Sequence, residues 1–112
     1  MTDEAMLNPD IETQITWNFK GDNYRFSLYF YKDDRDSAIL TSLEVNQDSR
    51  RCGIGTQIMD YVENFARHRE FKRIFLQILN INRNTWLHQW YLKQGYVFHE
   101  EDTSGIWLRK DI

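Results

Sequence analysis

The stretch that decides the fold is LEVNQDSRRCGIG, residues 43–55, because it joins two segments with different hydrophobic periods. The residues up to Val45 are expected to form a strand, which ends in the alternating Leu43-Glu44-Val45, whereas from Ile54 onward the apolar side chains recur every three or four residues, as in an amphipathic helix. Gly53 and Gly55 lie between the two segments. Glycine lets a backbone approach a ligand closely, and the first amides of a helix are unpaired and attract anions. The stretch therefore predicts a phosphate or pyrophosphate site at the start of a helix.

Two better-known phosphate loops fit this stretch poorly. A Walker A loop ends in Gly-Lys-Ser/Thr, but here Thr56 follows Gly55 directly. The dinucleotide fingerprint needs a third glycine at the position that Ile58 occupies. Two glycines alone are also compatible with a tight turn, yet their position between a strand and an amphipathic helix favours an anion site. Arg50 and Arg51 add positive charge to it.

Outward from this stretch, the hydrophobic pattern predicts one α/β domain. Three strands in an antiparallel meander are expected before the loop, at residues 15–19, 24–31 and 38–45. A helix, a buried strand, a second helix and two strands are expected after it, at residues 54–69, 73–79, 84–94, 96–100 and 106–109. Asn84 is predicted to cap the second helix and Gly95 to end it. A helical crossover before the strand at 73–79 predicts that this strand runs parallel to the one before the loop.

Length and composition predict a single domain over residues 1–112, with residues 1–12 as a tail without periodicity. The single cysteine, Cys52, can form no intramolecular disulfide and has no zinc-ligand spacing, which favours a reducing, cytoplasmic location and no metal. The acidic start does not resemble a signal peptide, and no apolar run approaches the roughly 20 residues that span a bilayer. The net charge of −3 disfavours nucleic acid as a partner.

Two motifs, in this order, resemble those of the GNAT superfamily of N-acetyltransferases. The acetyl-CoA motif Arg/Gln-x-x-Gly-x-Gly/Ala is met at Arg50, Gly53 and Gly55. The second motif, Asn-x-x-Ala-x-x-x-Tyr-x-x-x-Gly-Phe, is met with two mild substitutions at Asn84, Leu87, Tyr91, Gly95 and Tyr96. The resemblance covers about residues 38–109 and implies a mixed, mostly antiparallel sheet with a βαβ core and helices packed on it.

The resemblance also implies acetyl-CoA as cosubstrate. The amides of residues 51–56 would bind its pyrophosphate, and the backbone of Leu43 and Val45 would pair with its pantetheine arm. The thioester would lie where the strands that end at Val45 and Leu79 separate. Asn84 would either contact the pantetheine or only cap its helix. The cofactor residues implied are Leu43, Val45, Arg50, Arg51, Cys52, Gly53, Ile54, Gly55, Thr56 and Asn84.

The resemblance assigns Tyr91 as the donor of a proton to the leaving thiolate, whereas the alternative is an aromatic residue that packs on the sheet. Glu44 lies next to the expected reaction centre and is the candidate general base, with an ion-paired strand carboxylate as the alternative. His88 and His99 are further candidates, and water alone would serve for an amine that is already neutral. Cys52 has no neighbouring histidine in the sequence, which disfavours covalent catalysis.

The sequence therefore predicts transfer of an acetyl group from acetyl-CoA to a primary amine by direct attack in a ternary complex. GNAT proteins usually place two helices between their first two strands, but here these helices are reduced or absent. The open site favours a protein lysine or N-terminus as acceptor over a small amine. A non-catalytic module that binds coenzyme A or a protein partner is the first alternative, and a toxin acting on aminoacyl-tRNA is the second. Trp86 and Trp90 are expected in the core, unless exposure marks a homodimer or partner surface.

Overall fold

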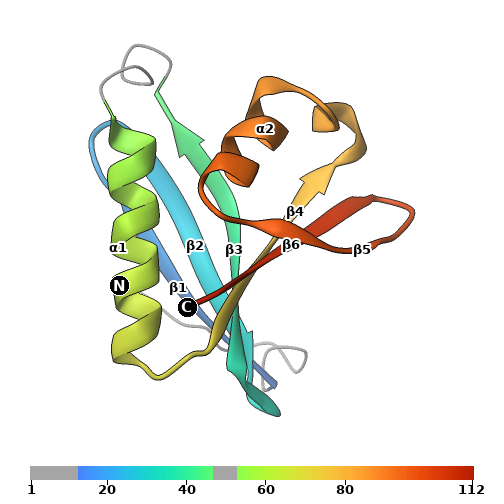
Figure 1. The fold of residues 1–112 in the computed structure, drawn as a ribbon. Helices are drawn as coiled ribbons and strands as arrows, with labels where there is room; N and C mark the ends of the chain where they lie inside the picture. The colour runs from blue at the N-terminus through green and yellow to red at the C-terminus, as the bar shows by residue number, and fades with distance from the viewer. Residues whose placement is uncertain (1–12, 47–52) are drawn as a thin grey trace.

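The computed structural model describes residues 13–46 and 53–112, and it forms one six-stranded sheet with two α-helices (Figure 1). The predicted tail at 1–12 and most of the loop that holds Arg50, Arg51 and Cys52 lie outside the described residues. All six predicted strands and both helices are present, with ends shifted by a few residues. Their bounds are β1 Gln14–Lys20, β2 Tyr24–Tyr31, β3 Asp34–Val45, α1 Ile54–His68, β4 Arg73–Leu79, α2 Trp86–Lys93, β5 Val97–Glu101 and β6 Gly105–Asp111, with a short 3-10 turn at Asn80–Asn82.

The strand order is β1-β2-β3-β4-β6-β5, and β3 with β4 is the parallel pair among antiparallel neighbours. The parallel ladder covers only Ser37–Ile39 against Arg73–Phe75. Both strands continue beyond this ladder, to Val45 and Leu79, without pairing to each other. The predicted separation of these two strand ends is therefore present. It opens a V in the sheet (Figure 1).

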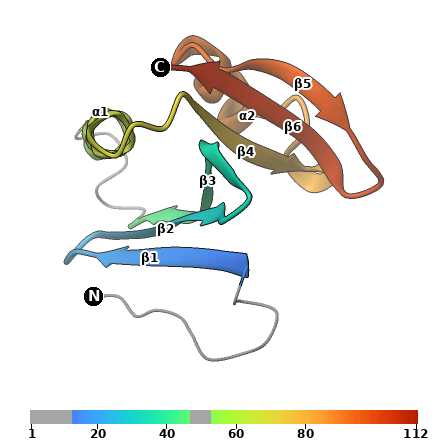
Figure 2. The same cartoon turned by 90° about the horizontal axis from the view of Figure 1, so that it is seen from below.

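The two edges of the sheet are β1 and β5 (Figure 2). β1 and β2 are joined directly by the tight turn at residues 21–23, where the Gly21 amide donates to the Tyr24 carbonyl. No α-helix lies between these two strands, and none precedes α1 within the described residues. The expectation that the N-terminal helices are reduced or absent agrees with this part of the structure.

A single apolar core lies between the sheet and the helices. The three- and four-residue spacing in α1 buries Ile58, Met59, Val62 and Ala66 against the strands, as its sequence pattern predicts. The core residues of the strands and of α2 are Phe26, Leu28, Phe30, Ala38, Leu40, Ile74, Leu76, Ile78, Tyr91, Ile106 and Leu108, joined by Phe71 and Tyr96 from the connections. Burial of these side chains is the main term that stabilises the fold.

The start of α2 corrects one prediction. The helix begins at Trp86 with Thr85 as its N-cap, and Asn84 precedes the cap with a positive φ of 62°. Asn84 therefore does not cap the helix, because its own backbone turns into the left-handed region; its N–H instead donates to His88 Nδ1 at 3.0 Å. Gly95 does end the helix as predicted, with φ of 99° and bonds from Gly95 N to Leu92 O and from Tyr96 N to Tyr91 O.

The C-terminus of α1 has the same motif without a glycine. Glu70 adopts φ of 67°, while Phe71 N donates to Ala66 O and Glu70 N to Arg67 O. A left-handed conformation strains a non-glycine residue by about 1–2 kcal/mol, and glycine at this position would remove that strain. Part of the gain is lost again, because glycine has more conformational freedom in the unfolded chain. We expect Glu70→Gly to raise the free energy of unfolding by about 0.5–1 kcal/mol, measured by urea denaturation. A loss of stability would show that the Glu70 side chain has a compensating role.

Candidate functional site

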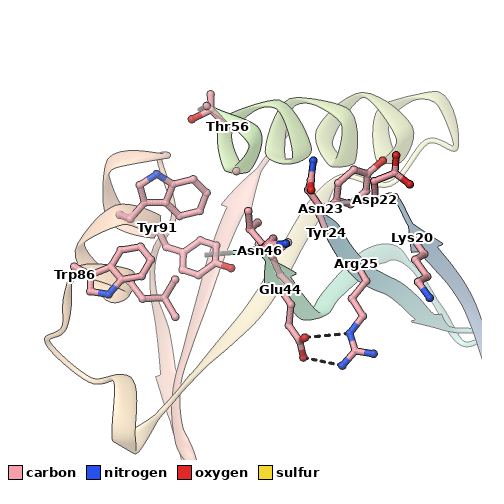
Figure 3. A pocket seen from close by; sticks show the side chains of 17 residues that line it. Lys20, Asp22, Asn23, Tyr24, Arg25, Glu44, Asn46, Thr56, Trp86 and Tyr91 are labelled. Carbon is pink, nitrogen blue, oxygen red and sulfur yellow. Dashed lines mark hydrogen bonds and ion pairs between the residues drawn. The ribbon is translucent and has the colours of Figure 1, made fainter. Parts of the chain in front are cut away.

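A cleft of about 630 Å³ lies between the end of β3 and α2, with the start of α1 at one end (Figure 3). The β1–β2 turn and β3 form one wall, and α2 forms the facing wall. Its lining residues are Lys20, Gly21, Asp22, Asn23, Tyr24, Arg25, Leu43, Glu44, Val45, Asn46, Gly53, Gly55, Thr56, Trp86, Leu87, Trp90 and Tyr91. The cleft therefore brings together the strand end, the glycines and the tyrosine that the sequence motifs select.

The start of α1 presents free backbone amides to this cleft. The first hydrogen bond of the helix runs from Gln57 N to Gly53 O at 3.0 Å, so the preceding amides lie ahead of the helical ladder. Gly53 has a φ of 77°, a conformation that favours glycine, and its missing Cβ would point into open space. Gly53, Gly55 and Thr56 line the cleft, whereas Ile54 faces a second cavity, of about 670 Å³, between α1 and the β1–β2 turn.

Gly55 has a second role that its motif does not predict. A Cβ built at Gly55 would lie 3.1 Å from the Trp90 ring, so glycine allows the start of α1 to pack closely against α2. The half-buried Trp90 is accordingly a packing residue at this junction, as expected, while Trp86 is 64% exposed on the cleft wall. Only one of the two tryptophans is thus largely exposed.

The end of β3 carries the residues predicted to face the cosubstrate. Leu43, Glu44 and Val45 all line the cleft. A bulge precedes them, because Arg25 and Ser27 on β2 pair with Glu44 and Thr41, and Ser42 within it has a φ of 59°. The bulge turns the strand end relative to its first half, where β3 pairs with β4.

Glu44 does not stand alone in the cleft. Arg25 donates from Nε to Glu44 Oε1 at 3.1 Å and from Nη2 to Oε2 at 3.0 Å, a two-point ion pair across neighbouring strands (Figure 3). The hydrogen bonds and charge of Arg25 lower the pKa of the Glu44 carboxyl below its ordinary value. Both side chains are 62% exposed, so the pair contributes little to stability. Its effect is to hold a charged carboxylate at a fixed place on the cleft wall.

Tyr91 lies on α2 opposite the end of β3, and its hydroxyl points across the cleft (Figure 3). The residue is 6% exposed, and burial raises the pKa of its phenol to about 12. The hydroxyl therefore stays protonated at neutral pH and can donate a hydrogen bond or a proton to an anion in the cleft.

Three other candidates lie away from the cleft lining. Asn84 precedes α2 and does not contribute to the cavity wall. His88 is 8% exposed, and its Nδ1 accepts the Asn84 N–H. His99 on β5 packs against Phe75, with ring centroids 4.8 Å apart. Neither histidine is therefore placed by the structure to take a proton in this cleft.

Sequence reasoning missed the wall that the β1–β2 turn supplies. Lys20 and Asp22 fall between the first two predicted strands and Arg25 falls in the second; none of them was a predicted site residue, although all three line the cleft. A strand pattern shows which face each residue occupies but not which residue of a neighbouring strand it meets, so Arg25 could not be paired with Glu44 in advance.

The described residues contain no group of three or more His, Cys, Asp or Glu side chains that could hold a metal ion. Within residues 13–46 and 53–112, no helix has the length and apolar character needed to cross a membrane.

A mixed sheet with separated parallel strand ends, a glycine-led helix start and a tyrosine across the cleft defines the N-acetyltransferase class of α/β folds. The profile of the Acetyltransferase (GNAT) family matches residues 17–96, and the chain belongs to this family. Members of the family are generally enzymes that transfer acyl groups. No curated protein sequence matches the chain.

Solved structures show the same fold at low sequence identity. An acetyltransferase from Bacillus cereus is 16% identical, with a TM-score of 0.67 over 96% of this chain and 81% of that chain. The PaiA N-acetyltransferase from Thermoplasma acidophilum, solved in complex with coenzyme A, is 16% identical, with a TM-score of 0.73 over 89% of this chain and 62% of that chain. An aminoglycoside 6'-N-acetyltransferase complexed with coenzyme A is 17% identical, with a TM-score of 0.65 over 88% of this chain and 73% of that chain.

Proposed function

We propose that this protein transfers an acetyl group from acetyl-CoA to a primary amine by direct attack in a ternary complex. The observation that carries the proposal is the convergence of three features on one cleft: the free amides at the start of α1, the end of β3, and the Tyr91 hydroxyl. Membership of the GNAT family and structural neighbours that hold coenzyme A support a cosubstrate of this type.

In this proposal the pyrophosphate of acetyl-CoA binds at the amides of Gly53–Thr56, where the helix dipole favours an anion. Arg50, Arg51 and Cys52 would complete the loop. The pantetheine arm lies along the end of β3 at Leu43 and Val45, inside the V that separates β3 from β4; Asn84 is not assigned a contact with it, because Asn84 does not line the cleft. This placement puts the thioester near Tyr91.

The amine enters the cleft as an ammonium, loses one proton to water, and then attacks the thioester carbonyl as a neutral amine. The attack forms a tetrahedral oxyanion, which backbone N–H groups near the end of β3 stabilise. Collapse of this intermediate breaks the carbon–sulfur bond and expels the coenzyme A thiolate. Tyr91 donates its phenolic proton or a hydrogen bond to that thiolate. The amine nitrogen, now part of an amide, releases its extra proton.

Glu44 is the candidate that receives this proton, directly or through water. Its ion pair with Arg25 lowers the pKa of the carboxyl, so it is a weak base and a persistent anion. We therefore propose that Glu44 mainly attracts the cationic amine to the cleft. Water is then the alternative acceptor of the proton that the amine nitrogen releases. The acceptor we propose is an amine of a protein, a lysine or an N-terminus, because in the described residues no helix is inserted between β1 and β2, whose turn lines the cleft.

Thr56→Glu tests the cosubstrate site by titration calorimetry with acetyl-CoA. The new carboxylate faces the proposed pyrophosphate, so we expect affinity to fall about tenfold or more. The first turn of α1 holds no acidic residue, and an acid there interacts favourably with the helix dipole, so the fold should be as stable as before.

Gln57→Glu is the matched control, since it adds the same charge one residue later but faces the second cavity. We expect a much smaller loss of affinity for it. If the wild-type protein does not bind acetyl-CoA, the proposal is rejected. Binding without release of free thiol in the presence of amines would favour the non-catalytic module instead.

A further inference from the structure

We propose that Trp86 determines acceptor specificity: its exposed indole face holds the alkyl-ammonium arm of the amine against the Glu44 carboxylate, which Arg25 keeps in position. The inference rests on the proposed transfer from acetyl-CoA and adds the residues that select the amine. Glu44 would touch the acceptor, and Arg25 is a positioning residue.

The two ends of the cleft differ in chemistry. Gly53, Gly55 and Thr56 present the start of α1 at one end, which suits the anionic cosubstrate. Trp86 and Glu44 lie away from that end and come from opposite walls, one from α2 and the other from β3 (Figure 3). We assign to the acceptor the part of the cleft that these two side chains line, beside the Tyr91 ring that projects between them (Figure 3).

Packing in the hydrophobic core does not account for a tryptophan at position 86. Its side chain is 64% exposed while it lines the cleft, whereas Trp90, one turn later, packs against Gly55. A largely exposed tryptophan gains little from burial within the protein, and exposed aromatic surface at a cleft is typical of a binding site. A ligand that covers the indole would bury this surface.

Trp86 and Glu44 together favour a ligand with a cationic group at the end of an alkyl chain. Tryptophan is the aromatic side chain that attracts a cation over its face most strongly. Arg25 engages each Glu44 oxygen once, which leaves further acceptor positions on the carboxylate for an ammonium. A primary ammonium at the end of an alkyl chain satisfies both walls, with methylenes on the indole and the charge at the carboxylate. A lysine side chain in a polypeptide and a free aliphatic diamine share this chemistry.

The test compares three amines with the full-length protein at saturating acetyl-CoA: a lysine peptide with a blocked N-terminus, 1,5-diaminopentane and glycinamide. We expect kcat/KM for one of the two alkylamines to exceed that for glycinamide at least about tenfold. The alkylamine with the higher kcat/KM shows whether the acceptor is a polypeptide lysine or a free diamine. Trp86→Leu keeps apolar area but removes the π face, and we expect it to raise KM for the preferred amine about tenfold. KM for acetyl-CoA should not change.

Two variants control this result. Trp86→Phe retains a weaker π face and should give an intermediate KM for the amine. Leu92→Ala removes another exposed apolar side chain of α2 that does not line the cleft, and it should leave the KM values unchanged. Arg25→Gln frees the Glu44 carboxylate and should raise KM for the amine more than it lowers kcat, while Arg25→Lys, which can hold one oxygen, should restore part of the loss.

The inference is overturned if amines are acetylated with equal kcat/KM, or if Trp86→Leu leaves KM for the amine unchanged. In either case acetyl-CoA binding and thiol release would still stand, so the proposed function would survive. Absence of acetylation for all three amines would overturn the inference, and loss of acetyl-CoA binding would reject the proposed function as well.

Discussion

Tyr91→Phe is expected to lower kcat about 100-fold, because it removes the proposed proton donor to the leaving thiolate. The ring stays, and the residue is 6% exposed in the core, so neither folding nor acetyl-CoA affinity should fall. Burial raises the pKa of the Tyr91 phenol to about 12, so the wild-type phenol stays protonated throughout the neutral range. The rate should therefore show no loss from Tyr91 ionisation as pH rises to about 10.

Tyr24→Phe is the matched control for this variant. Tyr24 also lines the cleft but lies on the β1–β2 side, away from the thiolate position that we propose. We expect kcat for Tyr24→Phe to stay within a few-fold of wild type. Steady-state rates measured by thiol release, with calorimetry for acetyl-CoA binding, separate chemistry from binding. Equal rates for Tyr91→Phe and wild type would assign Tyr91 to packing alone.

Lys110→Met is expected to lower the free energy of unfolding by about 3 kcal/mol, because it leaves the Glu63 carboxylate buried without its main partner. Lys110 Nζ lies 3.1 and 3.0 Å from the two Glu63 oxygens and donates to Gln94 O at 2.8 Å. The Glu63 side chain is only 10% exposed, and Arg67 approaches it no closer than 3.7 Å. The pair links β6 to α1 and to the end of α2, which carry the two sides of the cleft.

The double variant Lys110→Met/Glu63→Gln tests the cause of this loss of stability. It removes the buried charge, so most of the lost stability should return if the penalty arises from the unpaired carboxylate. Urea denaturation of the wild type and both variants measures the effect. A loss below about 1 kcal/mol for Lys110→Met would mean that water reaches Glu63 and screens it.

The helices and strands of this fold were predictable because residues close together in the sequence specify each of them. The apolar spacing of α1, its glycine-led start and the left-handed Gly95 after α2 are all local signals, and the structure has each of them. The motif at Tyr91 also predicted a tyrosine on α2, and this residue lines the cleft. Asn84 shows the limit of such reasoning: its residue type favours an N-cap, but its positive φ and its bond to His88 exclude that role.

The composition of the cleft walls could not be predicted in this way. Glu44 was expected near the reaction centre, but its pairing with Arg25, 19 residues away, depends on the β2–β3 register and the bulge at Ser42. The packing of Trp90 on Gly55 depends on how closely the two helices approach. Both contacts change the role assigned to a residue. Glu44 is an ion-paired carboxylate, and Gly55 allows close helix packing in addition to its place in the loop.

The sequence by itself determined the order of the elements and the family, because periodicity, glycines and motif spacing act over a few residues, and it predicts an anion site at the start of α1. Only the tertiary structure decided which side chains face one another across the cleft and which charges are paired. Lys110 and Glu63, 47 residues apart, meet through strand register and helix packing. Those arrangements are set by the whole core at once, and no local pattern specifies them.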